Sequence, residues 1–214
     1  MGKQGILTVV SGFSGAGKGT LMKALLEKYE YGLSISATTR APREGEQNGR
    51  EYFFLTKEQF EDMISKNELI EYAQYVGNYY GTPKKYVQQQ LDAGKNVILE
   101  IEIQGALNVK KMFPDALLIF VTPPSAAELK SRLVGRGTED METIDKRMKR
   151  AAEESQFMNS YDYIAVNDKL DECVEELNDT IQRAASLLAE GKKFDAEKDF
   201  SELIEKTQKE LELL

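Results

Sequence analysis

A glycine-rich segment near the start of the 214-residue chain constrains the fold more than any other feature. Before it, residues 6–10 read ILTVV, which predicts a buried strand; after it, residues 21–29 read LMKALLEKY, which predicts a helix. Between them, GFSGAGKGT places Gly12, Gly17 and Lys18 at the spacing of a phosphate-binding loop. Convergent backbone N–H groups, the helix N-terminus and the lysine each attract phosphate. The alternative is a turn whose glycines only permit a tight strand–helix junction.

The loop departs from the usual P-loop pattern at one position. A Ser or Thr normally follows the lysine and contacts Mg²⁺, but here Gly19 intervenes before Thr20. Thr20 is therefore the predicted metal-side hydroxyl. Lys18 is predicted to be catalytic, because it brings positive charge to the β- and γ-phosphates. The residues predicted to bind the nucleotide phosphates are Gly12, Phe13, Ser14, Gly15, Ala16, Gly17, Lys18, Gly19 and Thr20.

Composition limits the chemistry and the partners. The formal net charge of −8 argues against broad binding to nucleic acid or to an anionic membrane. The sequence has no histidine, which excludes an imidazole-based triad and most zinc sites, and its single Cys173 fits a reducing compartment. No apolar run approaches the ~20 residues that span a bilayer, and the N-terminus lacks a signal peptide's apolar stretch. We expect a cytoplasmic monomer or small homo-oligomer that binds small molecules.

Predicted strands alternate with predicted helices, which favours an α/β fold with a parallel sheet flanked by helices. Thr56 and Gln59 form a capping-box pattern that opens a helix, and Ser125 and Glu128 form another. Thr82 is expected to cap a helix that begins at Pro83. The remaining strands are expected at 31–36, 52–55, 96–103, 116–121 and 161–166, with two extended pieces inside 69–81.

The arginines are distributed unlike the lysines. Seven of the eight lie in the windows 40–50 and 132–150, whereas the twenty lysines are scattered. Because a guanidinium suits bidentate phosphate contacts, the clustering predicts two further anion sites. Arginines paired with nearby carboxylates on a solvated surface are the alternative. A donor loop, an acceptor clamp and a cationic lid together suit a phosphotransferase whose acceptor is itself phosphorylated.

These residues resemble the guanylate kinase family over about residues 5–190. Six blocks carry the resemblance in order: SGFSGAGKGT, SATTRAPREGEQNGREYFF, IEYAQYVGNYYGTP, ILEIEIQGA, PPSAAELKSRLVGRGTE and VND. The resemblance implies a P-loop kinase core with an inserted GMP-binding lobe and a helical lid. It implies transfer of the γ-phosphoryl group of ATP to GMP, with Mg²⁺. The expected division is a core at 1–36, 84–125 and 158–190, a lobe at 37–83, a lid at 126–157 and a charged helical tail at 191–214.

The resemblance also implies roles for single residues. The GMP phosphate is assigned to Arg40, Arg43, Tyr52 and Tyr80. Guanine recognition is assigned to Ser36, Glu71 and Thr82, and the same cleft is lined by Glu100 and Glu102. The lid groups that meet the ATP phosphates and the transferring phosphoryl are Arg132, Arg136 and Arg147, the last two catalytic, and Asn167 is expected near the adenine. Two positions depart from the family: Phe13 replaces a usual proline, and Glu102 a usual aspartate.

The chemistry of guanine agrees with the assigned carboxylate. Guanine's N1–H and N2–H₂ donors can both bond to Glu71, and its O6 can accept from a hydroxyl, whereas adenine lacks that donor pair. The residues alone leave simpler interpretations open. Glu71 also fits an outward position on an alternating strand, and Tyr79 and Tyr80 also fit packed aromatics of a hairpin.

Three other functions remain open from the sequence. A guanylate-kinase-like interaction module would do no chemistry, but such modules typically have a degraded phosphate loop. Adenylate kinase is the nearest enzyme, because of GAGKGT. A GTP-hydrolysing switch is suggested by VNDKLD, although the order of its residues is wrong for the guanine-specificity motif. The charged tail is expected to dock as a surface helix, with partner binding as the alternative.

Overall fold

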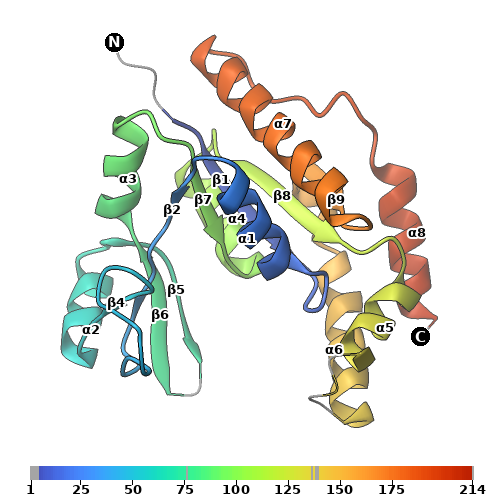
Figure 1. The fold of residues 1–214 in the computed structure, drawn as a ribbon, viewed down its shortest axis with the longest axis horizontal. Coiled ribbons are helices and arrows are strands. Elements are labelled where there is room, and N and C mark those ends of the chain that lie inside the picture. Colours follow the sequence, from blue (N-terminus) through green and yellow to red (C-terminus); the bar gives the residue numbers. More distant parts are fainter. Residues whose placement is uncertain (1–4, 76, 136, 138–139, 214) are drawn as a thin grey trace.

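The computed structural model describes residues 5–75, 77–135, 137 and 140–213 (Figure 1). Within this part of the chain, a five-stranded parallel sheet has the order β2-β7-β1-β8-β9. All residues of β1 and β8 are buried, as expected for central strands covered by helices on both faces. The α/β prediction is confirmed. The strands are β1 (Leu7–Gly12), β2 (Gly32–Leu33), β7 (Val97–Glu100), β8 (Leu117–Thr122) and β9 (Tyr163–Val166).

Helices cover both faces of this sheet. The helices α1 (Lys18–Lys28) and α7 (Leu170–Ala189) contact each other, and α4 (Ile103–Met112) contacts β1. The crossover from β1 to β2 runs in the opposite direction from the crossover between β7 and β8. Because such crossovers are right-handed, α1 and α4 lie on opposite faces. The helix α3 (Lys84–Asp92) packs beside β7.

A second, smaller sheet projects from the first (Figure 1). In the described residues its order is β4-β3-β6-β5, with β3 and β4 parallel and the other pairs antiparallel. It has its own small core of Ala37, Phe60 and Leu69. The capping box predicted at Thr56 is present and opens α2. These elements are β3 (Ala37–Thr38), β4 (Phe53–Phe54), α2 (Lys57–Ser65), β5 (Leu69–Tyr75) and β6 (Asn78–Pro83).

A helical pair connects β8 to β9. The helices are α5 (Ala126–Gly135) and α6 (Met141–Ser155), followed by the short 3-10 helix η1 (Met158–Ser160). The small sheet and this pair project from the same edge of the main sheet, where β1 ends (Figure 1). The carboxyl edge of a parallel sheet is where α/β proteins bind ligands. The glycine-rich loop lies at that edge, between the two projections (Figure 1).

The predictions for Thr82 and for the strand at 96–103 are wrong. Thr82 does not cap a helix: it is the fifth residue of β6, and Pro83 is the N-cap of α3, without a side-chain cap bond. The reason is that the Thr82 hydroxyl donates to Glu71 across the small sheet. The strand expected at 96–103 ends at Glu100, because Ile103 already begins α4 and turns into the main core.

Only the second half of the predicted helical tail forms a helix, and residues 192–200 before it are not helical. The helix α8 (Ser201–Glu212) packs against α5, α6 and η1, and buries Ile204 and Leu211 in the main core. The Phe200 ring, just before it, meets Tyr163 edge-to-face at 5.1 Å. No helix among the described residues combines the length and apolar character needed to cross a membrane.

Candidate active site

The loop between β1 and α1 has the conformation that its glycines permit. Gly12, Gly15 and Gly17 have φ values of 145°, 97° and 87°, a region that side chains with a Cβ rarely enter. A Cβ at Gly12 would also lie 2.1 Å from the Val121 carbonyl oxygen of the neighbouring strand. The Lys18 ammonium folds back over the loop, donating to the carbonyl oxygens of Gly12 (2.7 Å) and Phe13 (3.0 Å). Its charge is therefore held at the mouth of the loop.

Phe13 anchors this loop to the main core. Its ring is 1% exposed and meets the Phe120 ring edge-to-face, with 4.9 Å between centroids. Ala16 is fully buried as well. A large buried ring thus stands at the position where the family usually has proline, and packing rather than a fixed φ holds the loop in place.

Three side chains from distant segments converge on the loop. Arg147 of α6 donates to the Ser14 hydroxyl at 2.9 Å. Asn167, directly after β9, donates from Nδ2 to the Ala16 carbonyl at 2.9 Å, and Arg132 of α5 approaches the same carbonyl at 3.4 Å. Three of the predicted nucleotide-side residues are therefore brought to the loop.

Two further residues are predicted to act on the nucleotide side. Thr20 lies in the first turn of α1 with an exposed side chain. Arg136, predicted to be catalytic, falls outside the described residues. Across the ranges that the structure describes, no cluster of three or more His, Cys, Asp or Glu side chains has a metal-binding arrangement.

In the small sheet, Arg40 is held in a fixed orientation. Its guanidinium forms two 3.0 Å hydrogen bonds to the Glu46 carboxylate, and both side chains are only 17% exposed. The guanidinium also lies over the rings of Tyr52 and Phe54, at 5.4 and 5.7 Å. The hydrogen bonds from Arg40 lower the pKa of the Glu46 carboxyl, and those bonds raise the pKa of Arg40 in turn. Arg40 is thus paired with a carboxylate, as the alternative interpretation of the arginine clusters allowed.

The same carboxylate organises the neighbouring backbone. Glu46 accepts a 2.6 Å hydrogen bond from the backbone N–H of Arg43. The rings of Tyr52 and Tyr80 meet at 6.1 Å, and Arg40 lies over the Tyr52 ring, so three of the four predicted phosphate-binding side chains lie together. Tyr79 differs from its neighbour: its ring stacks on Phe60 at 5.1 Å, as expected for a packed hairpin aromatic.

Glu71 and Thr82 form a pair on adjacent strands. The Thr82 hydroxyl donates to Glu71 Oε1 at 2.7 Å, and Thr82 is fully buried. Burial raises the pKa of the Glu71 carboxyl, which the Thr82 hydrogen bond partly offsets. The second carboxylate oxygen lies close to Gly105 of α4, where a Cβ would approach it to 3.4 Å. Glu71 is therefore turned inward, and the interpretation as an outward strand residue is wrong.

A cavity of about 160 Å³ opens between the two sheets. Four predicted substrate residues, Ser36, Tyr52, Thr82 and Glu100, line it. Glu100 keeps contact with solvent, but partial desolvation by the surrounding protein raises the pKa of its carboxyl. The charge of Lys18 acts in the opposite direction and lowers that pKa. The Ser11 hydroxyl, directly before the glycine loop, donates to the backbone carbonyl of Ile101 at 2.8 Å, and Ile101 lines the cavity, so the cavity lies next to that loop. Glu102, at the N-cap of α4, is exposed and contributes a further negative charge there.

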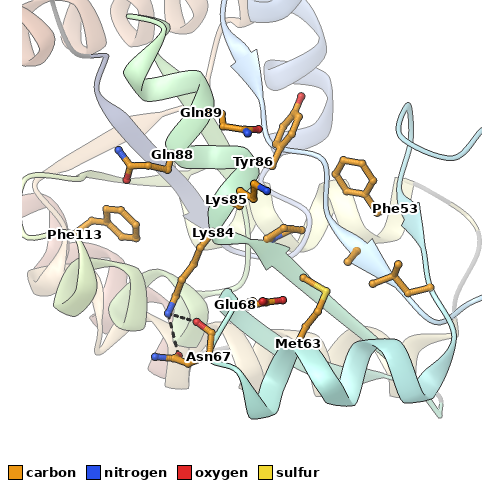
Figure 2. Close-up of a pocket in the computed structure, with 13 residues that line it drawn as sticks. Phe53, Met63, Asn67, Glu68, Lys84, Lys85, Tyr86, Gln88, Gln89 and Phe113 are labelled. Carbon is orange, nitrogen blue, oxygen red and sulfur yellow. Dashed lines mark hydrogen bonds between the residues drawn. The ribbon is translucent and has the colours of Figure 1, made fainter.

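A larger cavity lies elsewhere. Its volume is about 820 Å³, and Figure 2 shows it between α2, α3 and the end of α4. Apolar side chains such as Phe53, Met63 and Phe113 line it, and the Lys84 ammonium at its edge is already bonded to Asn67. No predicted site residue is found among the described residues that line this cavity.

Sequence reasoning missed the carboxylates that orient the arginines. Several acidic residues lie near the first arginine cluster, and nothing in the sequence marks Glu46 as the one that fixes the Arg40 fork. Glu128 accepts from Arg132 Nε at 2.8 Å, which the four-residue spacing on a helix could have indicated. It follows that the second capping box is only half formed: the Ser125 hydroxyl accepts from the backbone N–H of Glu128, whose carboxylate turns to Arg132.

A parallel sheet whose first strand leads through this loop into a helix, with a lysine folded over it, defines a P-loop nucleotide-binding protein. The family model described as guanylate kinase matches residues 4–184. The chain belongs to the guanylate kinase family.

Relatives and a solved structure agree with this assignment. The guanylate kinase of Halalkalibacterium halodurans is 54% identical over 177 residues, covering 82% of this chain and 86% of that protein. The guanylate kinase of Bacillus subtilis is 52% identical over 181 residues, covering 83% and 88%. The crystal structure of guanylate kinase from Anaplasma phagocytophilum is 32% identical, covers 85% and 86%, and superposes with a TM-score of 0.64.

Proposed function

We propose that this protein is a guanylate kinase, which transfers the γ-phosphoryl group of ATP to GMP and forms ADP and GDP. Family membership and relatives named guanylate kinase at about 50% identity support this function. The observation that carries it is the presence of two separate sites that present basic side chains. One is the loop with Lys18, and the other is Arg40 held by Glu46. A hydrolase needs only the first, whereas transfer to a phosphorylated acceptor needs both.

The loop suits the donor nucleotide. Its positive-φ glycines and the N-terminus of α1 present backbone N–H groups to phosphates, and Lys18 adds charge. Arg132 and Arg147 contact Ala16 and Ser14 of the loop, so a small rotation of either guanidinium turns it from the loop to a bound phosphate. We assign Arg136 a similar catalytic role from the family pattern.

Magnesium fits the first turn of α1. Thr20 presents an exposed hydroxyl there, and Mg²⁺ is typically bound by few protein oxygens together with substrate phosphates and water. When bound, Mg²⁺ neutralises charge on the phosphates of the donor. We propose Thr20 as its protein contact and Asn167 as a residue near the adenine.

The acceptor site follows from the cavity between the sheets. Its volume of about 160 Å³ is below the roughly 300–1,000 Å³ of whole-ligand pockets, so it suits the base alone. Thr82 and Ser36 line this cavity, and the Thr82 hydroxyl is bonded to the Glu71 carboxylate. We assign these three side chains to guanine. We place the GMP phosphate at Arg40, Arg43, Tyr52 and Tyr80, and Glu100 and Glu102 at the side facing the loop. The division into a core, a lobe at 37–83 and a lid at 126–157 stays part of this proposal.

The decisive assay measures ADP formation from ATP with GMP or AMP as acceptor. Sites that hydrogen-bond the distinguishing groups of a substrate can discriminate by about 10⁴-fold, so kcat/KM for GMP should exceed that for AMP by a large factor. Lys18→Ala is expected to abolish turnover. Preference for AMP would favour an adenylate kinase, and no turnover above the Lys18→Ala level would favour an interaction module.

A second assay tests the acceptor clamp. Arg40→Ala should raise KM for GMP steeply and leave KM for ATP nearly unchanged. The matched control is Arg50→Ala in the same segment, whose exposed guanidinium bonds Glu51 and the Gly45 carbonyl. Equal losses for ATP and GMP in Arg40→Ala would contradict the assignment.

A further inference from the structure

The helix α8 lies beyond the segment matched by the family model, which ends at residue 184. It nevertheless packs against both α5 and α6, the helices that carry Arg132 and Arg147 (Figure 1). Ile204 and Leu211 of α8 are buried at this contact. The tail therefore touches the elements that bring positive charge to the glycine loop, although it is remote from the loop in sequence.

Two hydrogen bonds tie α8 to the lid helices. Glu210 Oε2 accepts from the backbone N–H of Ala126, the first residue of α5, at 2.9 Å. Gln208 Nε2 donates to the carbonyl of Ser155, the last residue of α6, at 3.1 Å. The first N–H groups of a helix have no partner inside the helix, and a carboxylate is favoured at that positive end. Glu210 thus supplies from the tail a contact that α5 cannot make for itself.

From that point a continuous set of contacts leads to the loop. The Ser125 hydroxyl accepts from the backbone N–H of Glu128, the Glu128 carboxylate holds Arg132 Nε at 2.8 Å, and Arg132 approaches the Ala16 carbonyl. Arg132 lies six residues after Ala126, about 9 Å along the helix axis. If the first turn of α5 frays or changes direction, the position of the Arg132 guanidinium at the donor site therefore changes with it.

We propose that Glu210 is a positioning residue for phosphoryl transfer, which acts through α5 to place Arg132 against the donor phosphates. This inference rests on the proposed kinase function. It sets Glu210 apart from the acceptor site, because α8 contacts the lid helices and the small sheet lies at the opposite side of the molecule (Figure 1). The effect of changing Glu210 should therefore appear in the parameters for ATP and not in those for GMP.

The first experiment compares Glu210→Ala with Glu205→Gln. Glu205 lies on the same helix with its side chain 71% exposed and is a matched control. Glu210→Ala should lower kcat/KM for ATP about fivefold, the factor that matches loss of a helix-cap contact, and leave KM for GMP unchanged. Glu210→Gln keeps an acceptor oxygen and should recover most of the activity. Equal effects on ATP and GMP, or no difference from Glu205→Gln, would overturn the proposal. If Glu210→Ala does not fold, Glu210→Met, which fills similar space without an acceptor oxygen, is compared with Glu205→Met by the same criterion.

A double-mutant cycle tests the route through α5. Arg132→Lys keeps the charge but loses the forked geometry, so turnover remains measurable. In this background Glu210→Ala should lower kcat/KM for ATP less than it does in the wild type, since contacts in one network are not additive. Additive effects would refute transmission through Arg132. Two measurements separate this inference from the kinase function on which it rests. Absence of GMP-dependent activity in the wild-type protein would refute the kinase function. Calorimetric binding of ADP needs no turnover, and equal ADP affinity of Glu210→Ala and Glu205→Gln would refute the positioning role.

Discussion

Replacing Glu71 by glutamine tests the acceptor site most directly. The carboxylate is turned inward, with Oε1 at 2.7 Å from the Thr82 hydroxyl, and its burial raises the pKa of the group. Glutamine has the same shape, and its carbonyl oxygen can still accept from Thr82. The change therefore preserves packing and converts only the second carboxylate oxygen into an NH₂ donor.

The expected loss follows from the hydrogen bonds to guanine. A carboxylate accepts from both N1–H and N2–H₂, whereas the amide of glutamine offers one acceptor and places a donor against a donor. A hydrogen bond to a charged group contributes about 1.5–3 kcal/mol, so kcat/KM for GMP should fall about 10- to 100-fold. The kcat/KM for AMP should stay level or rise, because the NH₂ of glutamine can donate to N1 of adenine. KM for ATP should not change.

The folding stability of Glu71→Gln, unlike its activity, should not fall. Because burial raises the pKa of Glu71 in the folded state, the ionised carboxylate opposes folding above that pKa, and the penalty is relieved as the pH falls through it. Glu71→Gln should therefore be as stable as the wild type or more stable at neutral pH. The difference in free energy of unfolding should shrink as the pH is lowered.

Steady-state kinetics with GMP and AMP, together with urea unfolding at two pH values, provide the measurements. Glu61→Gln, an exposed glutamate of α2 in the same lobe, is the control and should leave the GMP preference intact. An unchanged kcat/KM for GMP in Glu71→Gln would refute the assignment of Glu71 to the base. A marked loss of stability at neutral pH would refute the desolvation argument.

Three further predictions concern the loop and the core. Gly17→Ala forces a φ of 87° on alanine and brings its Cβ to 2.6 Å from Asn167 Nδ2; KM for ATP should rise while KM for GMP stays constant, and the reverse would contradict the donor assignment. Phe13→Ala removes a buried ring packed on Phe120 and should cost about 3–5 kcal/mol in urea unfolding, a loss that a loosely packed loop would not show. Burial raises the pKa of Cys173 to about 12, so iodoacetamide at pH 8 should label unfolded protein much faster than native protein; equal rates would show an accessible thiol.

The glycine loop could be predicted because its determinants are local. Gly12, Gly17 and Lys18 lie within seven consecutive residues, and the strand before them and the helix after them follow from periodicity alone. The capping box of Thr56 and Gln59 is similarly contained in four residues and is present as expected. Interactions of such short range depend little on how the rest of the chain folds.

Residues with a choice of partner could not be placed in this way. Thr82 precedes a proline and has the pattern of a helix cap, whose hydroxyl would accept from the first N–H groups of α3. Instead, β5 brings Glu71 beside it, and the hydroxyl donates to that carboxylate. Arg40 could have met several carboxylates close in sequence, and only the fold of the segment selects Glu46. These outcomes depend on strand pairing, which periodicity does not specify.

The sequence alone determined the α/β class, the phosphate loop and, through resemblance, the kinase family. Each of these depends on short segments of sequence or on the order of such segments. The tertiary structure decided which distant side chains meet that loop: Arg132, Arg147 and Asn167 approach it from 116 to 151 positions away, and Glu210 reaches α5 across 84. The physical reason is that a hydrogen bond depends on the distance and direction between two groups in space. Both are set by how the helices pack on the main sheet and on one another.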